Sequence, residues 1–207
     1  AEIIRMMFAA NGVEFDDVRF KPNAEGVEGP NAEFIEFKKS GKCPTGQVPF
    51  LEMDGKSYYQ TMAIMRMLAK KYGMAGKNDE ESYQLDAITA TIGDAQNAVV
   101  AIMFGGFSPE EQKKRMGEFM TDEMKGMPRY LGYIEKLAAA SSTGFLVGDS
   151  LTYADLYAYD FFTTMQGRVK EQGGGDIFEK CAALGKYCNG IGENAKLKSY
   201  LAGRPAQ

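Results

Sequence analysis

The side chains that could carry chemistry in this chain are limited by the complete absence of histidine. Without histidine, Ser-His-Asp catalysis, Cys-His catalysis and histidine-ligated metal sites are all excluded. The cysteines Cys43, Cys181 and Cys188 include no CxxC pair, which argues against a zinc site or a disulfide framework. We therefore expect no metal, and any chemistry must use hydroxyls, lysines, carboxylates, a thiol or backbone dipoles.

One short stretch could present its backbone to a ligand. The sequence GQVPFLEMDG, residues 46–55, reads as a strand that ends in an Asp-Gly hairpin turn. Pro49 interrupts this strand, although proline is normally confined to edges, bulges or first positions because it lacks an amide donor. An edge-strand or bulge proline is the plain structural interpretation, and a backbone that faces a ligand is the functional one.

A second candidate site lies at the start of the helix predicted over 61–73. A helix N-terminus offers unpaired amides and partial positive charge, which suit a carboxylate. The Thr61 hydroxyl can add a hydrogen bond there. Thr61 is therefore either a plain N-cap or part of a carboxylate site, and the two roles are compatible.

The elements around these stretches change in character along the chain. Up to residue 73, strand and helix patterns alternate, whereas from residue 80 onward the pattern is helical only, which places a domain boundary within 75–80. Strands are expected at 13–20 and in a hairpin over 48–59, a loop over 21–33, and helices over 1–11, 33–40, 61–73, 80–103, 108–139, from 152 onward, 176–188 and 193–201.

The helical part carries specific start and break motifs. Residues 108–111 and 152–155 each form a capping box, in which Thr152 is the N-cap and Asp155 the partner carboxylate. We interpret Asp155 as structural. The pair Gly126 and Pro128 predicts a kink or break near that point.

Composition excludes further classes of function. A net charge of −4 argues against a general binder of nucleic acid or of anionic membranes. No apolar run approaches the ~18–20 residues of a membrane span, and no signal peptide is evident. We expect no nucleic acid or membrane partner and a reducing, cytoplasmic location.

Four motifs, taken in order, resemble those of the cytosolic glutathione transferases. GQVPFLEMDG is similar to the family's cis-proline loop and hairpin, and Gln60-Thr61 followed by MAIMRMLA is similar to its Gln-Ser element with threonine for serine. TYAD, residues 152–155, is similar to the family's capping box, and AEIIR, residues 1–5, to the start of its first helix. The resemblance is nearest to the sigma-like group of prostaglandin D synthases, helminth enzymes and cephalopod crystallins.

This resemblance implies an α/β thioredoxin-like N-terminal domain, residues 1–74, followed by an all-α C-terminal domain, residues 80–207. It also implies that glutathione, as co-substrate, is held by the first domain. A cis Val48-Pro49 bond would leave the Val48 amide and carbonyl free to pair with the cysteinyl part of glutathione as a short strand. By the same resemblance, Gln60 and Thr61 hold the γ-glutamyl carboxylate.

Other site residues follow from the resemblance, and each has a plainer alternative. Phe37 and one of Lys38, Lys39 and Lys42, with Lys42 the first choice, would reach the glycine carboxylate of glutathione. Asp94 would reach the ligand's ammonium across a dimer interface. The alternative for the lysine is a solvated basic face, and the alternative for Asp94 is a surface carboxylate. A cluster of Met and Phe side chains would line the electrophile pocket. The alternative is that this cluster belongs to the hydrophobic core. The implied glutathione set is Gln47, Val48, Pro49, Gln60, Thr61, Lys42, Phe37 and Asp94, and the implied pocket set is Met103, Phe104 and Phe107.

The activity implied is that of a homodimeric glutathione transferase that conjugates glutathione to small hydrophobic electrophiles in detoxification, with isomerase or peroxidase side activity. The alternatives are a structural, lens crystallin-like protein and a glutathione-binding protein without turnover.

In the family, a first strand with the catalytic tyrosine precedes the segment that matches Ala1 and Glu2. The catalytic residue is therefore unassigned here, and the chain as written is expected to lack that strand and to activate glutathione poorly.

Overall fold

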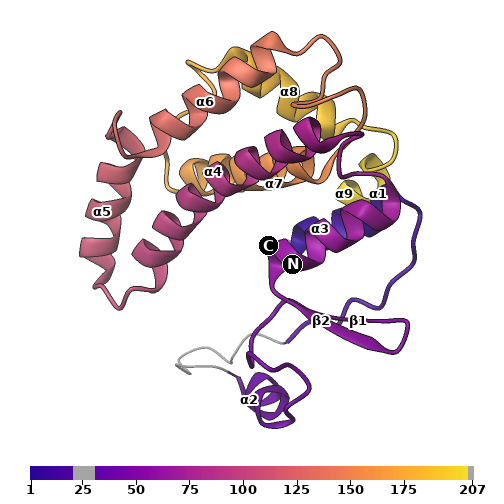
Figure 1. Cartoon of the computed structure of the whole chain (residues 1–207). Coiled ribbons are helices and arrows are strands. Elements are labelled where there is room, and N and C mark those ends of the chain that lie inside the picture. The colour runs from indigo at the N-terminus through magenta and orange to yellow at the C-terminus, as the bar shows by residue number, and fades with distance from the viewer. Residues whose placement is uncertain (21–30, 205–207) are drawn as a thin grey trace.

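The computed structural model describes residues 1–20 and 31–204 of the chain (Figure 1). Most of the loop expected over 21–33, and residues 205–207 of the second predicted domain, lie outside the described residues. The helices are α1 (Glu2–Ala10), α2 (Ala32–Lys39), α3 (Thr61–Tyr72), α4 (Asp79–Phe104), α5 (Pro109–Thr121), α6 (Met127–Ala140), α7 (Tyr153–Glu171), α8 (Ala182–Gly192) and α9 (Lys198–Gly203), and the strands are β1 (Phe50–Met53) and β2 (Lys56–Tyr59).

The predicted hairpin is confirmed. Strands β1 and β2 are antiparallel, with Phe50 opposite Tyr59. Their turn has positive φ at both central residues, 53° at Asp54 and 72° at Gly55. This is the type I′ geometry that suits the right-handed twist of the two strands.

The strand predicted over 13–20 is wrong. Among the described residues, the sheet contains β1 and β2 alone, and 13–20 has no ladder partner. Phe15 instead packs on Phe8, with ring centroids 5.5 Å apart. Val13 and Phe15 pack against the core, but Val18 is 83% exposed, and a strand also needs a neighbouring backbone to pair with.

Two helical features join the parts of the chain. Helix α1 packs against α3 on one side and α7 on the other, and it contributes the fully buried Met6 and Met7 to the core. The Tyr153 amide at the start of α7 donates to the Met74 carbonyl at the end of the first part, over 3.3 Å. In Figure 1 α1 and α3 therefore lie beside the helical layer, with the hairpin and α2 beyond them.

Helix α4 is the longest helix described, with 26 residues. An 18-residue window has a mean hydropathy of 1.3, so by length and composition alone it could cross a membrane, which corrects the expectation that no run comes near this length. The helix packs against α5, α6 and α7, although only 28% of that window is buried within the chain.

The break predicted near 126–128 is confirmed as a full interruption between α5 and α6. The Asp122 carboxylate accepts the amides of Met124 at 2.8 Å and Lys125 at 3.0 Å, which lowers the pKa of Asp122. A Cβ atom at Gly126 would lie 2.1 Å from the Phe119 carbonyl oxygen. Only glycine fits this close approach.

The capping box of α7 is also confirmed, and Asp155 does more than cap. Its carboxylate accepts the Thr152 amide at 2.9 Å, the Leu146 amide at 2.9 Å and the Tyr187 hydroxyl at 2.9 Å. Burial raises the pKa of this carboxyl despite these bonds. Asp155 therefore ties together the loop before α7, the start of α7, and α8.

The last two helices begin later than predicted. Instead of starting near residue 176, α8 begins at Ala182, where the Glu135 carboxylate of α6 accepts the amides of Ala183 at 3.2 Å and Leu184 at 2.7 Å. This cap comes from a residue far away in the sequence, and no local pattern reveals it.

Candidate functional site

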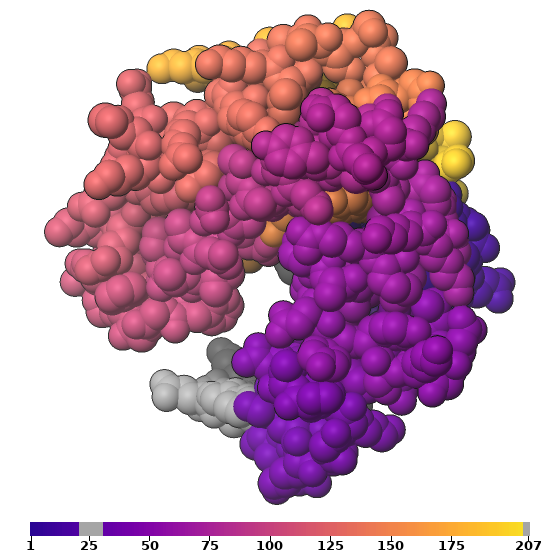
Figure 2. Space-filling model, in the orientation of Figure 1, coloured from indigo at the N-terminus to yellow at the C-terminus, as the bar shows by residue number. Residues whose placement is uncertain are grey.

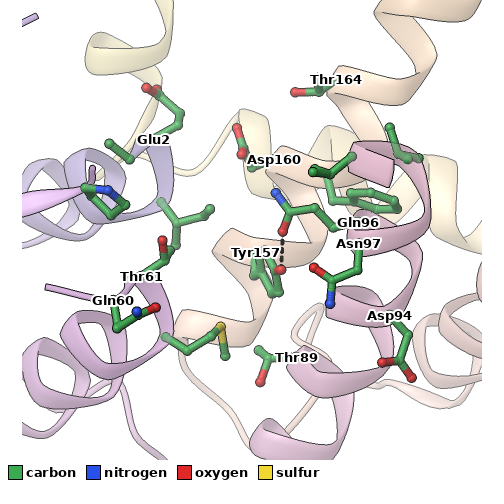
Figure 3. Close-up of a pocket in the computed structure, with 18 of the residues that line it drawn as sticks. Glu2, Gln60, Thr61, Thr89, Asp94, Gln96, Asn97, Tyr157, Asp160 and Thr164 are labelled. Carbon is green, nitrogen blue, oxygen red and sulfur yellow. Dashed lines mark hydrogen bonds between the residues drawn. The ribbon is translucent and has the colours of Figure 1, made fainter. Parts of the chain in front are cut away.

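A cavity of about 870 Å³ lies between the two parts of the chain. Figure 2 shows the molecule hollowed between them. One side, here named the loop wall, consists of Thr45, residues 47–49 and residues 60–62. The other side, here named the helical wall, consists of side chains from α4 and α7. The close-up in Figure 3 shows Gln60 and Thr61 facing Gln96, Asn97 and Asp94 across the cavity.

Val48 lines the cavity on the loop wall. The Val48-Pro49 bond is cis, as expected. Val48 precedes β1 and is 52% exposed, and among the described residues neither its amide nor its carbonyl has a backbone partner. A backbone donor and acceptor that face a cavity can pair with an extended peptide.

The loop that carries Val48 is fastened from behind by a buried thiol. The Cys43 thiol donates to the Gln47 carbonyl over 3.3 Å and lies 3.2 Å from the Thr45 hydroxyl. The bond to Thr45, more than any other contact, lowers the pKa of Cys43. This side chain holds the backbone of 45–47 in place and lies beneath the loop.

The second part of the loop wall is the N-terminus of α3. Gln60 is the N-cap, with φ 72° and ψ 111°, and makes no side-chain capping bond. Thr61 is the first helical residue, so the alternative that Thr61 is a plain N-cap is wrong. The first amides of α3 are thus available, and the Thr61 hydroxyl lies beside them on the cavity. This arrangement can hold a carboxylate.

The helical wall combines polar side chains with an apolar end. The Tyr157 hydroxyl of α7 donates to the Gln96 side-chain oxygen of α4, a bond drawn dashed in Figure 3. Burial, followed by the charge of Asp160, raises the pKa of Tyr157 to about 12. Further along α4, Met103 and Phe104 line the cavity, and Phe104 is 82% exposed.

Asp160 is the most perturbed carboxyl on the helical wall. Its Oδ1 atom is buried and has no hydrogen-bond partner among the described residues. Glu2 also lies on the cavity wall, and the Arg204 guanidinium is 3.1 Å from Glu2 but 3.9 Å from Asp160. Burial is the largest cause that raises the pKa of Asp160, to about 6, and the negative charge of Glu2 is the second.

Comparison with known proteins places this geometry in one family. The family model described as glutathione S-transferase, C-terminal domain, matches residues 93–204. Glutathione S-transferase 3 of Caenorhabditis elegans is 36% identical over 99% of this chain and 91% of its own length. The chain belongs to the glutathione S-transferase family.

Solved structures agree on the fold. A glutathione S-transferase of the hookworm Necator americanus, described as monomeric, is 30% identical with a TM-score of 0.79, over 100% of this chain and 93% of that one. A prostaglandin synthase D of Nilaparvata lugens has a TM-score of 0.81 over 100% of this chain and 93% of that one, at 24% identity. At that identity the second likeness concerns the fold alone.

The cavity of this glutathione S-transferase brings together most of the predicted site residues. Those on its walls are Gln47, Val48, Pro49, Gln60, Thr61, Asp94, Met103 and Phe104. Residues predicted to bind glutathione and residues predicted to bind the electrophile therefore line the same cavity.

Three predicted residues lie away from the cavity. Phe37 packs on Phe50 with ring centroids 5.5 Å apart. Lys42 is exposed on the loop that follows α2. Phe107 lies beyond the turn that ends α4, where its ring is 4.1 Å from the Arg115 guanidinium carbon. Their proposed contacts with ligands stay predictions.

Sequence reasoning missed most of the helical wall. Gln96 and Asn97 of α4, and Tyr157, Asp160 and Arg168 of α7, line the cavity. The three α7 residues are separated by three and by eight positions, which places them on one face of the helix. Residues that line a cavity and residues that pack in a core share this periodicity, so spacing alone could not identify them.

Proposed function

We propose that this protein transfers glutathione to small apolar electrophiles, with glutathione on the loop wall and the electrophile against the helical wall. One observation carries this proposal. The cavity joins an unpaired backbone at Val48 and an open helix N-terminus at Thr61 to the apolar side chains of Met103 and Phe104. A peptide-like ligand with a terminal carboxylate suits the first wall, and an uncharged electrophile suits the second.

The proposed glutathione contacts follow the loop wall. The Val48 amide and carbonyl pair with the cysteinyl residue beside Pro49 and Gln47. Thr61, Gln60 and the first amides of α3 hold the γ-glutamyl carboxylate. Lys42 and Phe37 would reach the glycine carboxylate, and this is the least supported contact because neither residue lies on the cavity.

No catalytic group is assigned among the described residues. A free thiol has a pKa near 8.5, so only a few per cent is thiolate at pH 7. Tyr157 is the one tyrosine on the walls of the cavity among the residues described, and its proton already bonds Gln96. We therefore assign activation of the sulfur to none of the described residues.

We also propose two domains, residues 1–74 and 80–207. The match of the C-terminal family model to residues 93–204 supports the second. Isomerase or peroxidase side activity, a role in detoxification and a cytoplasmic location complete the proposal.

A homodimer built on α4 is the proposed assembly. Its support is that only 28% of the apolar window of α4 is buried within the chain, and that Tyr83 and Val100 on this helix are 68% and 45% exposed. Asp94 on the same helix would then reach the ammonium of glutathione bound to the partner. Sedimentation at micromolar concentration tests this, and a monomer, as described for the hookworm relative, would remove the role of Asp94 across the interface.

Two measurements test the proposed function. Retention on immobilised glutathione reports binding, and turnover of 1-chloro-2,4-dinitrobenzene reports transfer. Binding with turnover supports a transferase. Binding alone would indicate a glutathione-binding protein without catalysis, and neither would indicate a structural, crystallin-like role.

A further inference from the structure

Arg168 is a cation on the cavity wall that has no anionic partner among the described residues. It lies on the helical wall in the last turn of α7. Among the described residues, no carboxylate lies within 4.0 Å of its guanidinium, whereas the other arginine on the cavity wall, Arg66, contacts Asp86 at 2.7 Å. An arginine without a partner at the edge of a ligand cavity is available to an anion on the ligand.

The position of Arg168 follows from how α4 and α7 run. Tyr153 of α7 donates to Asp86 of α4 at 2.6 Å, and Tyr157, one turn later, donates to Gln96. The two helices therefore advance in the same direction. Arg168 lies about 16 Å along the axis beyond Tyr157, which brings it close to the level of the C-terminal end of α4.

That end of the cavity is mostly apolar. Met103 and Phe104 of α4 and Met165 of α7 line it, beside the polar Thr164. The acidic side chains of the helical wall lie further back. Asp160 precedes Arg168 by about 12 Å along α7, a distance given by eight residues of helix rise. An anionic group next to Arg168 would thus avoid Asp160 while its apolar body covers the Met and Phe side chains.

We propose that Arg168 selects amphipathic electrophiles, which carry an apolar reactive body and a carboxylate or sulfonate at the far end. This inference rests on the proposed function. With an activated aryl chloride that carries a carboxylate, the glutathione thiolate forms an S–C bond at the ring carbon, and the C–Cl bond breaks to release chloride. The carboxylate stays unchanged, so Arg168 acts as a specificity-determining residue and not in the bond-making step.

The first experiment measures binding with a matched pair of fluorescent probes. 8-Anilinonaphthalene-1-sulfonate is anionic, and N-phenyl-1-naphthylamine has the same aromatic skeleton without the sulfonate. We expect Arg168→Ala to weaken binding of the sulfonate about tenfold, as for one partly solvated charge-assisted hydrogen bond. Binding of the neutral probe should stay unchanged, and Arg168→Lys should restore part of the loss.

Lys170→Ala is the control, because Lys170 lies in the same last turn of α7 but not on the cavity wall. It removes the same charge from the same helix end, and we expect it to leave both probes unaffected. An equal loss for both probes, the same loss in Lys170→Ala, no loss in Arg168→Ala, or no binding of the sulfonate to the parent protein would each overturn the inference.

Turnover separates this inference from the proposed function. The parent protein is assayed with 4-chloro-3,5-dinitrobenzoate and with its methyl ester, beside 1-chloro-2,4-dinitrobenzene. We expect Arg168→Ala to raise the KM for the acid several-fold relative to the ester, with kcat little changed. Absence of all turnover together with the expected probe result would refute transferase activity while leaving the anion site of Arg168 in place.

Discussion

The two walls of the cavity hold their ligand-facing groups by different means. The loop wall depends on unusual backbone geometry, with a cis bond before Pro49 and a positive φ at Gln60, and α2, which precedes it, has no buried residue. The helical wall depends on regular helices whose opposite faces form the core, including the fully buried Ile92 of α4 and Phe162 of α7.

Because of this difference, a mutation on the loop wall and one on the helical wall should affect folding to different extents. On the loop wall, the groups that face the cavity contribute little to the core, so they can change with small effects on folding. On the helical wall, cavity residues alternate with core residues along the same helices, and charged groups there are partly desolvated. Mutations on the two walls should therefore have different ratios of stability change to binding change.

The largest effect is expected where the helical wall is anchored. Asp155→Ala should lower the free energy of unfolding by about 3–5 kcal/mol, because it leaves the buried Tyr187 hydroxyl and the Leu146 and Thr152 amides without their acceptor. Urea unfolding monitored by circular dichroism measures this. Asp149→Ala, which removes an exposed ion pair with Lys77, is the control and should change the free energy of unfolding far less. Similar losses in both variants would contradict a special role for Asp155.

The anchoring of α7 could be predicted from sequence, whereas that of α8 could not. Thr152 and Asp155 are three residues apart, and a capping box is a local motif that depends on helix geometry alone. The start of α8 depends on Glu135, and the Leu146 and Tyr187 contacts of Asp155 also cross the fold. Contacts between distant residues leave no periodic pattern in the chain.

The same contrast applies to the candidate site. Pro49 was found because proline is unusual in a strand, Thr61 because it begins a predicted helix, and Gln60 through the resemblance to the family. The polar residues of the helical wall, such as Tyr157 and Arg168, were missed because which face of a helix meets a cavity is decided by packing. The strand predicted over 13–20 failed for a related reason, since pairing requires a neighbour that alternation does not reveal.

A pH-dependent effect should distinguish the helical wall from the loop wall. The pKa of Asp160 is raised from 3.8 to about 6, so the folded state binds a proton more tightly than the unfolded state. This contributes stability that is present below about pH 4 and lost as pH rises through about 6. Asparagine stays neutral at every pH. As pH rises from 4 to 7.5, the free energy of unfolding of Asp160→Asn should therefore increase by about 1–3 kcal/mol relative to that of the parent.

Urea unfolding of both proteins across that range provides the measurement. The relevant quantity is the difference between variant and parent at each pH, because other carboxyls titrate in both proteins alike. A difference that stays constant with pH would show that Asp160 is not desolvated as the structure indicates. A difference in the opposite direction would show that a cation stabilises its charged form.

On the loop wall, a change of one hydroxyl should affect binding without affecting folding. Thr61→Val keeps the branched shape at the first position of α3 and removes the hydroxyl beside the helix amides. We expect glutathione to bind about 5–20-fold more weakly, the size of one hydrogen bond to a charged group, with unfolding free energy within about 0.5 kcal/mol of the parent. Calorimetric titration measures the affinity.

Thr164→Val makes the same chemical change on the helical wall, where Thr164 also lines the cavity, and should leave the affinity for glutathione unchanged. If both variants weakened glutathione binding to the same extent, the division of the cavity into a glutathione wall and an electrophile wall would be wrong.

The smallest effect tests whether the loop wall holds Gln60 in a costly conformation. A φ of 72° at a residue other than glycine is unfavourable, and glycine is also a better N-cap than alanine. Gln60→Gly should therefore be more stable than Gln60→Ala by about 1 kcal/mol in urea unfolding.

Both variants lack the side chain, so calorimetric titration should show the same weakened affinity for glutathione in each. Equal stability of the two variants would indicate that Gln60 is not held at positive φ in solution. Restoration of glutathione affinity by glycine alone would indicate that the backbone at residue 60, and not its side chain, contacts the ligand.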